Sequence, residues 1–171
     1  MKISGANCVG KGGGMLLDVN LLDPELVVLN LEVENKDDVM MELANILLKK
    51  GIVKPSYLQA LIEREAVYPT GLQTKEFGVA IPHADIQHVV RPSVAIATLK
   101  NPVKFNLMAS PEETIDVKIV FMLALTEPQK QLQLLQDLIS LFQASHLIKQ
   151  MLKCNDRQMF IDVVNQINQS E

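Results

Sequence analysis

The sequence has few cysteines, no secretory signal and no apolar run long enough to cross a bilayer. Its two cysteines, Cys8 and Cys154, lie far apart and lack metal-ligand spacing, so free thiols in a reducing compartment are the simplest interpretation. The longest apolar run, Ile119 to Leu125, is much shorter than the ~20 residues of a membrane-spanning helix. These absences predict a cytoplasmic protein without direct membrane insertion.

The sequence also lacks an excess of positive charge. Its net charge is −4 and its pI is near 5.4, with acidic and basic residues interspersed along the chain. A weakly acidic chain without charge blocks is a poor partner for nucleic acid or for an anionic membrane surface. At 171 residues it has the length of one domain, and we find no internal repeat.

The first 14 residues, MKISGANCVGKGGG, are glycine-rich and have no apolar period. We expect a flexible leader over residues 1–14, either a natural tail or an added one, and a single domain over residues 15–171. A phosphate-binding Walker loop would need Ser or Thr after Lys11, whereas Gly12 follows it. A segment with five glycines and no apolar face cannot offset the cost of ordering the backbone, about 1 to 2 kcal/mol per residue.

The first half of the expected domain combines a strand with two helices. Val27–Val33 is rich in β-branched and aliphatic residues, which indicates a strand. Asn35 is a suitable N-cap for a helix that ends before Gly51. Ser56 and Gln59 have the spacing of a capping box for a second helix, which we expect to run to about Ala66.

The second half begins with strands and ends with helices. Strands are expected at residues 78–81, 94–99 and 103–107, with Asn101-Pro102 marking a break, and at 117–125, whose continuous apolar sequence suits a central strand. Pro128 suits the first turn of a helix, a short helix follows near Leu147, and Asn155 with Gln158 repeats the cap pattern before the last one. The order β-α-α-β-β-β-α-α-α predicts a three-layer α/β domain with a mixed sheet flanked by helices.

Residues 78–85, GVAIPHAD, place a histidine directly after a short apolar strand. Pro82 has no N–H for a strand ladder, so we expect the strand to stop at Ile81 and His83 to meet solvent. Open α/β sheets bind ligands beyond the carboxyl ends of their strands, and an imidazole with an unperturbed pKa of ~6.5 is mostly neutral and nucleophilic. His83 is therefore a candidate for chemistry, and the alternative is a hydrogen-bonded loop residue.

The other two histidines, His88 and His146, suit ordinary surface positions. His88 follows His83 at a spacing that fits neither one helix face nor one strand face, and no cysteine or carboxylate pair completes a tetrahedral metal set. The sequence therefore predicts neither a metal nor a cofactor. Asp85 could orient His83 through a hydrogen bond, or it could simply make a turn.

Three stretches carry a resemblance to a known family: EREAVYPTG at 63–71, GVAIPHAD at 78–85 and LALTEPQKQLQLLQDL at 123–138. From about Leu29 to Ile167 the chain resembles enzyme IIA of the phosphoenolpyruvate-dependent sugar phosphotransferase system, in the fructose/mannitol class. The resemblance implies a mixed sheet flanked by helices. It also implies that His83 accepts a phosphoryl group from the phosphocarrier HPr and passes it to a cysteine of a cognate enzyme IIB, which acts with a membrane permease, enzyme IIC.

The resemblance also points to Arg64 and Gln131. Arg64 matches the family's R-E pair, and a planar guanidinium can stabilise phosphoryl oxygens, although a surface ion pair on its helix is the alternative. Many family members carry a second histidine at the position of Gln131. A glutamine amide can donate a hydrogen bond there but cannot carry positive charge. The surrounding P-Q-x-Q-L-x-L-L pattern looks closest to the galactitol-type branch.

Two functions of different class fit these residues. The first is a phosphoryl carrier that feeds a sugar permease, with galactitol as one candidate sugar. The second is a regulatory interaction module of the same fold, whose phosphorylation state is sensed by a partner protein. His83 and Arg64 suit both functions, so the sequence leaves them open.

Overall fold

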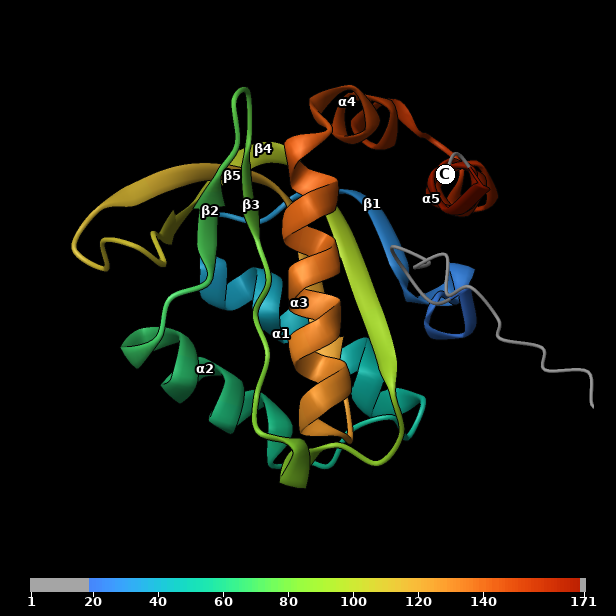
Figure 1. Ribbon diagram of the computed structural model, residues 1–171. Helices are drawn as coiled ribbons and strands as arrows, with labels where there is room; N and C mark the ends of the chain where they lie inside the picture. The colour runs from blue at the N-terminus through green and yellow to red at the C-terminus, as the bar shows by residue number, and fades with distance from the viewer. Residues whose placement is uncertain (1–18, 170–171) are drawn as a thin grey trace, which may run out of the picture.

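A mixed five-stranded sheet lies at the centre of the protein (Figure 1). This computed structural model describes residues 19–169, with side chains for residues 20–166. The strands lie in the order β1-β4-β5-β3-β2, with parallel pairing of β1 with β4 and of β3 with β5, and antiparallel pairing elsewhere. Their bounds are β1 Val27–Leu31, β2 Gly71–Gln73, β3 Gly78–Ala80, β4 Ser93–Asn106 and β5 Thr114–Ala124.

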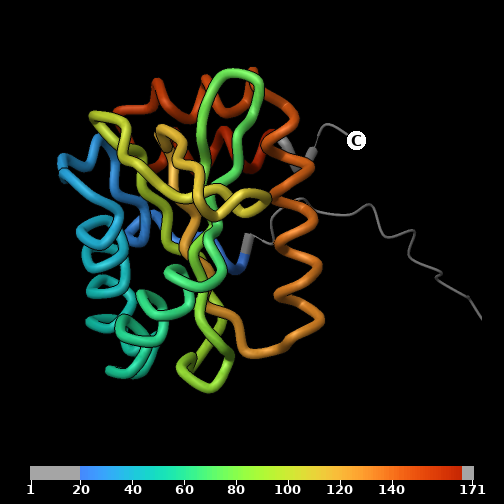
Figure 2. Tube along the Cα trace, turned by 90° about the vertical axis from the view of Figure 1, so that its left-hand side faces the viewer, coloured from blue at the N-terminus to red at the C-terminus, as the bar shows by residue number. Residues whose placement is uncertain are grey.

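Helices cover both faces of the sheet, so the predicted three-layer α/β fold is confirmed. Figure 2 shows one helical layer at the left of the sheet and α3 at its right. The helices are α1 Lys36–Lys49 and α2 Tyr57–Val67 in the first layer, and α3 Pro128–Gln143, α4 Ser145–Lys153 and α5 Arg157–Gln169 in the second; 3₁₀ turns occupy Val19–Leu21, Pro24–Leu26 and Ile86–His88. None of the described helices is both long enough and apolar enough to cross a membrane.

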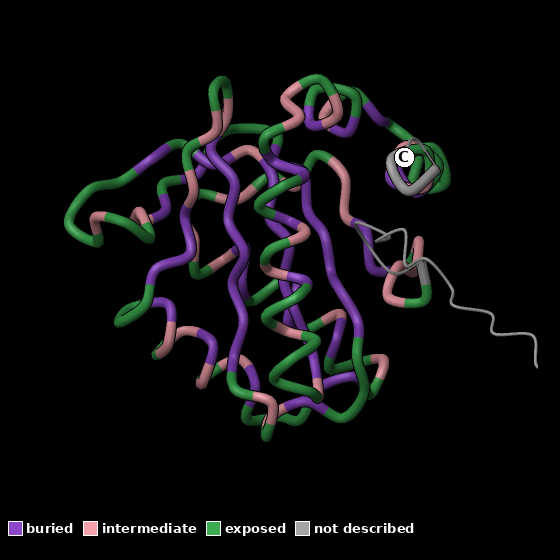
Figure 3. Tube along the Cα trace, in the orientation of Figure 1, coloured by how far each residue is buried: buried purple, intermediate pink, exposed green. Residues whose placement is uncertain are grey.

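The central strand β5 explains why the core has two halves. Side chains alternate along a strand between the two faces of its sheet. Val120 and Met122 therefore pack towards α1 and α2, while Ile119 and Phe121 pack towards α3, α4 and α5. The ring of Phe121 lies 5.5 Å from that of Phe142 in α3. Figure 3 shows the resulting continuous burial of the central strands.

The capping patterns in the sequence predicted some helix ends correctly and others wrongly. The Asn35 side chain accepts a hydrogen bond from the Asp38 N–H at 2.9 Å, as expected of an N-cap. Gly51 follows α1 with φ +68, a conformation that glycine adopts without steric cost. The capping box at Ser56 was wrong, because Ser56 has helical dihedral angles and its hydroxyl is hydrogen-bonded to His88 Nδ1 at 2.8 Å instead.

Two strand predictions and one further cap also need correction. The break at Asn101-Pro102 is a register shift within one continuous strand, β4, rather than a boundary between two strands. The short strand β2 was not expected, because three residues carry too little pattern to identify. At the start of α5 it is Asp156, not Asn155, whose side chain accepts from a helix N–H, that of Met159 at 2.9 Å. The expected leader, residues 1–14, lies outside the described residues.

Candidate functional site

His83 lies beside the carboxyl end of the central strand. The Pro82 carbonyl accepts a hydrogen bond from the Leu123 N–H at 3.0 Å, and His83 forms a parallel bridge with Leu123. The chain therefore stays paired with β5 after β3 has ended. His83 is 8% exposed, so the expectation that it meets solvent freely was wrong. Strand β3 ends at Ala80, one residue before the predicted Ile81, and the Pro82 carbonyl continues the pairing that its missing N–H cannot.

The imidazole of His83 is held in one orientation. Its Nδ1 lies 2.9 Å from the Ile81 carbonyl oxygen. A carbonyl only accepts hydrogen bonds, so Nδ1 carries the proton of the neutral ring and Nε2 keeps its lone pair. Burial is the main cause that lowers the pKa of His83, and the positive charge of Arg64 lowers it further; the bond to Ile81 and the charge of Asp85 act in the opposite direction. The site therefore favours a neutral imidazole with a free Nε2.

Arg64 lies on the last turns of α2 and faces the loop that contains His83. Its Nη1 is 3.1 Å from Asp85 Oδ1, and its guanidinium lies 5.5 Å from the centre of the Tyr68 ring. Its Nε is a buried donor that has no acceptor among the described residues. The structure thus pairs Arg64 with a loop carboxylate rather than with a residue of its own helix. Asp85 accepts this bond from Arg64 instead of orienting the imidazole.

Glu65 was not recognised as part of this region. It is 2% exposed, and both of its carboxylate oxygens accept hydrogen bonds from Thr70. A signal was present in the sequence, because Glu65 continues the apolar stripe of α2 formed by Leu58, Leu61 and Ile62. An acid at a core-facing position of an amphipathic helix is unusual and indicates a specific partner.

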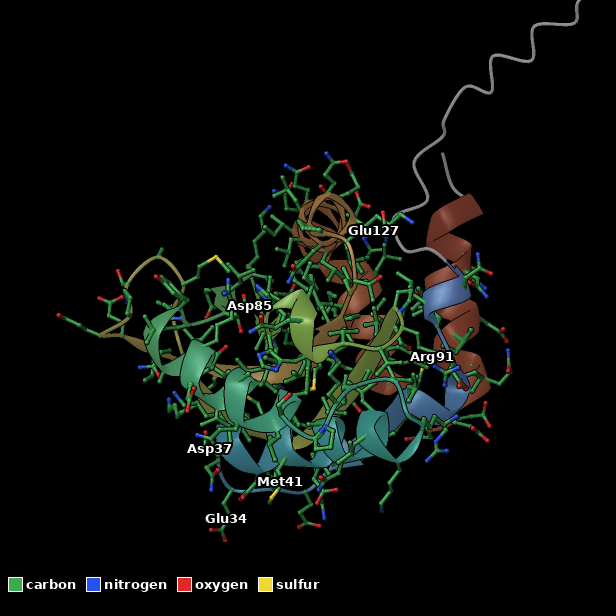
Figure 4. The ribbon with its side chains drawn as sticks, turned by 90° about the horizontal axis from the view of Figure 1, so that it is seen from below. Glu34, Asp37, Met41, Asp85, Arg91 and Glu127 are labelled. Atoms are coloured by element: carbon green, nitrogen blue, oxygen red, sulfur yellow. The ribbon has the colours of Figure 1, made fainter. Side chains whose placement is uncertain are left out.

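The first turn of α3 approaches the site from the opposite side. Figure 4 views this end of the molecule and shows the loop after β3 between α2 and the start of α3, with Asp85 and Glu127 both on this face. Gln131 is half-buried, and its backbone N–H donates to the Glu127 carbonyl at 3.0 Å. Among the described residues, no hydrogen bond joins its side chain to His83. Arg64 therefore acts on His83 through its charge, whereas Gln131 has no such interaction with His83 among the described residues.

Other candidate sites lie away from His83. His88 is bonded to Ser56 and His146 is exposed. The described residues contain no cluster of three metal-ligating side chains. A pocket of about 540 Å³ lies between the β2–β3 hairpin and the later part of α3, and its lining includes Leu72, Lys75 and Phe142 but none of the site residues.

Comparison with known proteins identifies the family. The family described as "Phosphoenolpyruvate-dependent sugar phosphotransferase system, EIIA 2" matches residues 20–167. The chain belongs to this family. It is 30% identical over 125 residues to the galactitol-specific EIIA component of Escherichia coli K12, a match that covers 73% of this chain and 83% of that protein.

Two further proteins are similar to this chain, a transcriptional regulator and a mannitol enzyme IIA in a solved complex. The transcriptional regulator ManR of Bacillus subtilis is 29% identical over 145 residues, which cover 84% of this chain and 21% of that protein. The Escherichia coli complex of mannitol enzyme IIA with phosphorylated enzyme IIB superposes with a TM-score of 0.70 at 19% identity, covering 85% of this chain and 97% of that one. The second likeness confirms the fold of this EIIA chain.

Proposed function

We propose that this EIIA chain is a phosphoryl carrier that acts through His83. Membership of the family supports a role in phosphoryl transfer. The observation that carries the proposal is the hydrogen bond from His83 Nδ1 to the Ile81 carbonyl, which leaves Nε2 as the nucleophile. A phosphorylated HPr is the proposed donor, and a cysteine of a cognate enzyme IIB is the proposed acceptor.

The transfer balances without any cofactor. The lone pair of Nε2 attacks the phosphorus of the donor phosphohistidine, the new N–P bond forms, and the bond to the donor nitrogen breaks. In the second step a thiolate of enzyme IIB attacks the same phosphorus, and Nε2 leaves with its lone pair. Nδ1 keeps its proton throughout and donates it in a hydrogen bond to the Ile81 carbonyl, so this bond also supports the positive charge that the ring gains on phosphorylation.

Arg64 is proposed to stabilise the phosphoryl oxygens. Phosphoryl transfer needs donors positioned around oxygens that carry the charge, more than it needs covalent help from the protein. With Nη1 on Asp85, the guanidinium still has other N–H groups to offer. Gln131 is proposed as a further hydrogen-bond donor from the first turn of α3, where the helix N-terminus also favours an anion.

The surface beside Arg64 suits protein partners. Val67 and Tyr68 are both 64% exposed at the end of α2, and aromatic side chains are common in interface centres. Two successive protein partners could cover these large exposed apolar side chains next to the phosphoryl site. The Escherichia coli mannitol enzyme IIA forms a complex with phosphorylated enzyme IIB, which supports an enzyme IIB as a partner of this chain. The proposed carrier is a cytoplasmic protein that acts with an IIC permease.

A regulatory role is the second candidate, since ManR contains a related domain. In that case phosphorylation of His83 would be sensed by a partner protein rather than passed to a sugar. The likeness to the galactitol-specific component favours transport, with galactitol as the first sugar to test.

The deciding experiment is incubation of the chain with phosphoenolpyruvate, enzyme I and HPr, followed by mass spectrometry under alkaline conditions. We expect one phosphoramidate on His83, stable in base and lost in acid. Subsequent addition of a galactitol-type enzyme IIB should discharge the label onto its cysteine. Label on His88 or His146 would refute the assignment, and charged protein that discharges to no enzyme IIB tested would favour the regulatory role.

A further inference from the structure

Glu65 is a buried acid close to the proposed phosphoryl site, and both of its carboxylate oxygens are hydrogen-bonded. Its Oε1 accepts from the Thr70 backbone N–H at 3.0 Å, and its Oε2 accepts from the Thr70 hydroxyl at 2.9 Å. Both residues are 2% exposed. Burying a carboxylate is costly unless its oxygens find donors, and here Thr70 supplies one donor to each oxygen. The pair closes the turn between α2 and β2.

Thr70 connects this pair to the histidine. Its carbonyl accepts the Ile81 N–H at 3.3 Å, and the Ile81 carbonyl accepts the His83 Nδ1–H at 2.9 Å. The N–H of Ile81 is thus bonded to Thr70, and its carbonyl is bonded to the His83 ring. Hydrogen bonds therefore run from Glu65 through Thr70 and Ile81 to His83.

We propose that Glu65 is a positioning residue for phosphoryl transfer: it fixes Thr70, and through Ile81 it holds the tautomer and orientation of the His83 ring. The inference rests on the proposed role of His83. Nε2 can attack in line only if Nδ1 is the protonated nitrogen and the ring does not rotate, which makes the Ile81 carbonyl decisive. Glu65 also follows Arg64 directly in α2. The same helical turn therefore positions the guanidinium and, through Thr70 and Ile81, the nucleophilic ring.

The other end of α2 supplies a matched control. Tyr57 is fully buried, and its hydroxyl donates to the Leu123 carbonyl at 2.7 Å. Leu123 is the residue that forms the bridge with His83. Tyr57→Phe therefore removes a buried hydrogen bond to the residue that pairs with His83, but this bond does not lead to Nδ1. A general loosening of the core would affect both variants, whereas positioning through Ile81 affects Glu65 variants alone.

The test measures the ring directly. Two-dimensional ¹⁵N–¹H correlation spectra of the imidazole report which nitrogen of His83 carries the proton. In Glu65→Ala we expect a substantial fraction of the Nε2–H tautomer, whereas wild type and Tyr57→Phe stay in the Nδ1–H form. Glu65→Gln should rescue the wild-type tautomer, because its amide oxygen can still accept from the Thr70 N–H.

The same proteins are then assayed for acceptance from phosphorylated HPr. Glu65→Ala should be slower by roughly tenfold to hundredfold, the cost of displacing a reacting group by about an ångström, while Glu65→Gln and Tyr57→Phe stay within a few-fold of wild type. A folded Glu65→Ala protein with the wild-type tautomer and rate would overturn the proposal, and so would an equal tautomer shift in Tyr57→Phe. If wild-type His83 accepts no phosphoryl group, the proposed function fails, but the tautomer spectra still decide whether Glu65 positions the ring.

A second pair of variants covers the case in which Glu65→Ala does not fold. Thr70→Val keeps the shape of the side chain and the backbone bond to Oε1 but removes the hydroxyl donor to Oε2. It should shift the tautomer and rate in the same direction by a smaller amount, and Thr70→Ser should restore both. Thr70→Val with an unchanged tautomer would count against the proposal.

Discussion

The two sides of His83 are built very differently. On the α2 side, Arg64 forms an ion pair with Asp85 and Glu65 forms two bonds to Thr70. On the α3 side, Gln131 is half-buried and, within the described part of the chain, makes no side-chain hydrogen bond to His83. One side is organised before any phosphoryl group arrives, whereas the other offers a helix N-terminus and an uncommitted amide. The difference predicts that α2 residues dominate the transfer rate.

The largest effect is expected at His83 itself. His83→Ala should abolish phosphoryl acceptance, because no other described histidine occupies the sheet edge. The ring is buried and bonded to Ile81, so the substitution should also lower the free energy of unfolding by about 1 to 3 kcal/mol. Circular dichroism and denaturant unfolding would check the fold. Undiminished labelling of His83→Ala would eliminate the assignment, and His88→Ala and His146→Ala should label normally.

Arg64 should give the next largest effect. Arg64→Ala removes every donor of the guanidinium and should slow acceptance roughly hundredfold, while Arg64→Lys keeps the charge but loses the planar fork and should cost roughly tenfold. Arg91→Lys is the matched control, since Arg91 donates to the Lys50 carbonyl at 3.0 Å rather than to the site loop. Rates near wild type in both Arg64 variants would return this residue to a surface ion pair.

The pH dependence separates the charges around the ring. The pKa of His83 lies below the ordinary value because of burial and the charge of Arg64. The nucleophile must be neutral, so acceptance should persist as pH falls below the usual ~6.5 and decline only as the lowered pKa is reached. NMR titration should show the pKa of His83 rising in Arg64→Ala, which removes a repelling cation, and falling further in Asp85→Asn, which removes an attracting anion.

Glu127→Gln provides the control for that titration. Glu127 lies on the same end of the molecule as Asp85 (Figure 4), but its charge is not among the causes that shift the pKa of His83. Its loss should leave the titration of His83 unchanged. A shift as large as that of Asp85→Asn would mean that net charge on this face, rather than the specific Arg64–Asp85 pair, controls the ring.

Sequence patterns predicted the fold better than they predicted the surroundings of the site. Apolar periodicity and proline positions gave the layer order, because burial of one helix face or of a whole strand leaves a repeating signal over many residues. The burial of His83 had no such signal, since it depends on pairing between Pro82 and Leu123, residues distant in sequence. Glu65 did leave a signal, because it continues the apolar stripe of α2, but its bond to Thr70 depends on a turn geometry that periodicity does not reveal.

Gln131 is expected to have the smallest effect, and it tests the comparison most sharply. If the α3 side contributes one neutral hydrogen bond to a phosphoryl oxygen, Gln131→Ala should cost about 1 kcal/mol, or roughly fivefold in rate. Stopped-flow acceptance from phosphorylated HPr would measure it against Gln133→Ala, whose side chain is already bonded to Asp137 at 2.9 Å and should have no effect. Equal rates in the two variants would remove Gln131 from the site. A loss as large as that of Arg64→Ala would instead show that the α3 side closes on the phosphoryl group during transfer and that the two sides contribute equally.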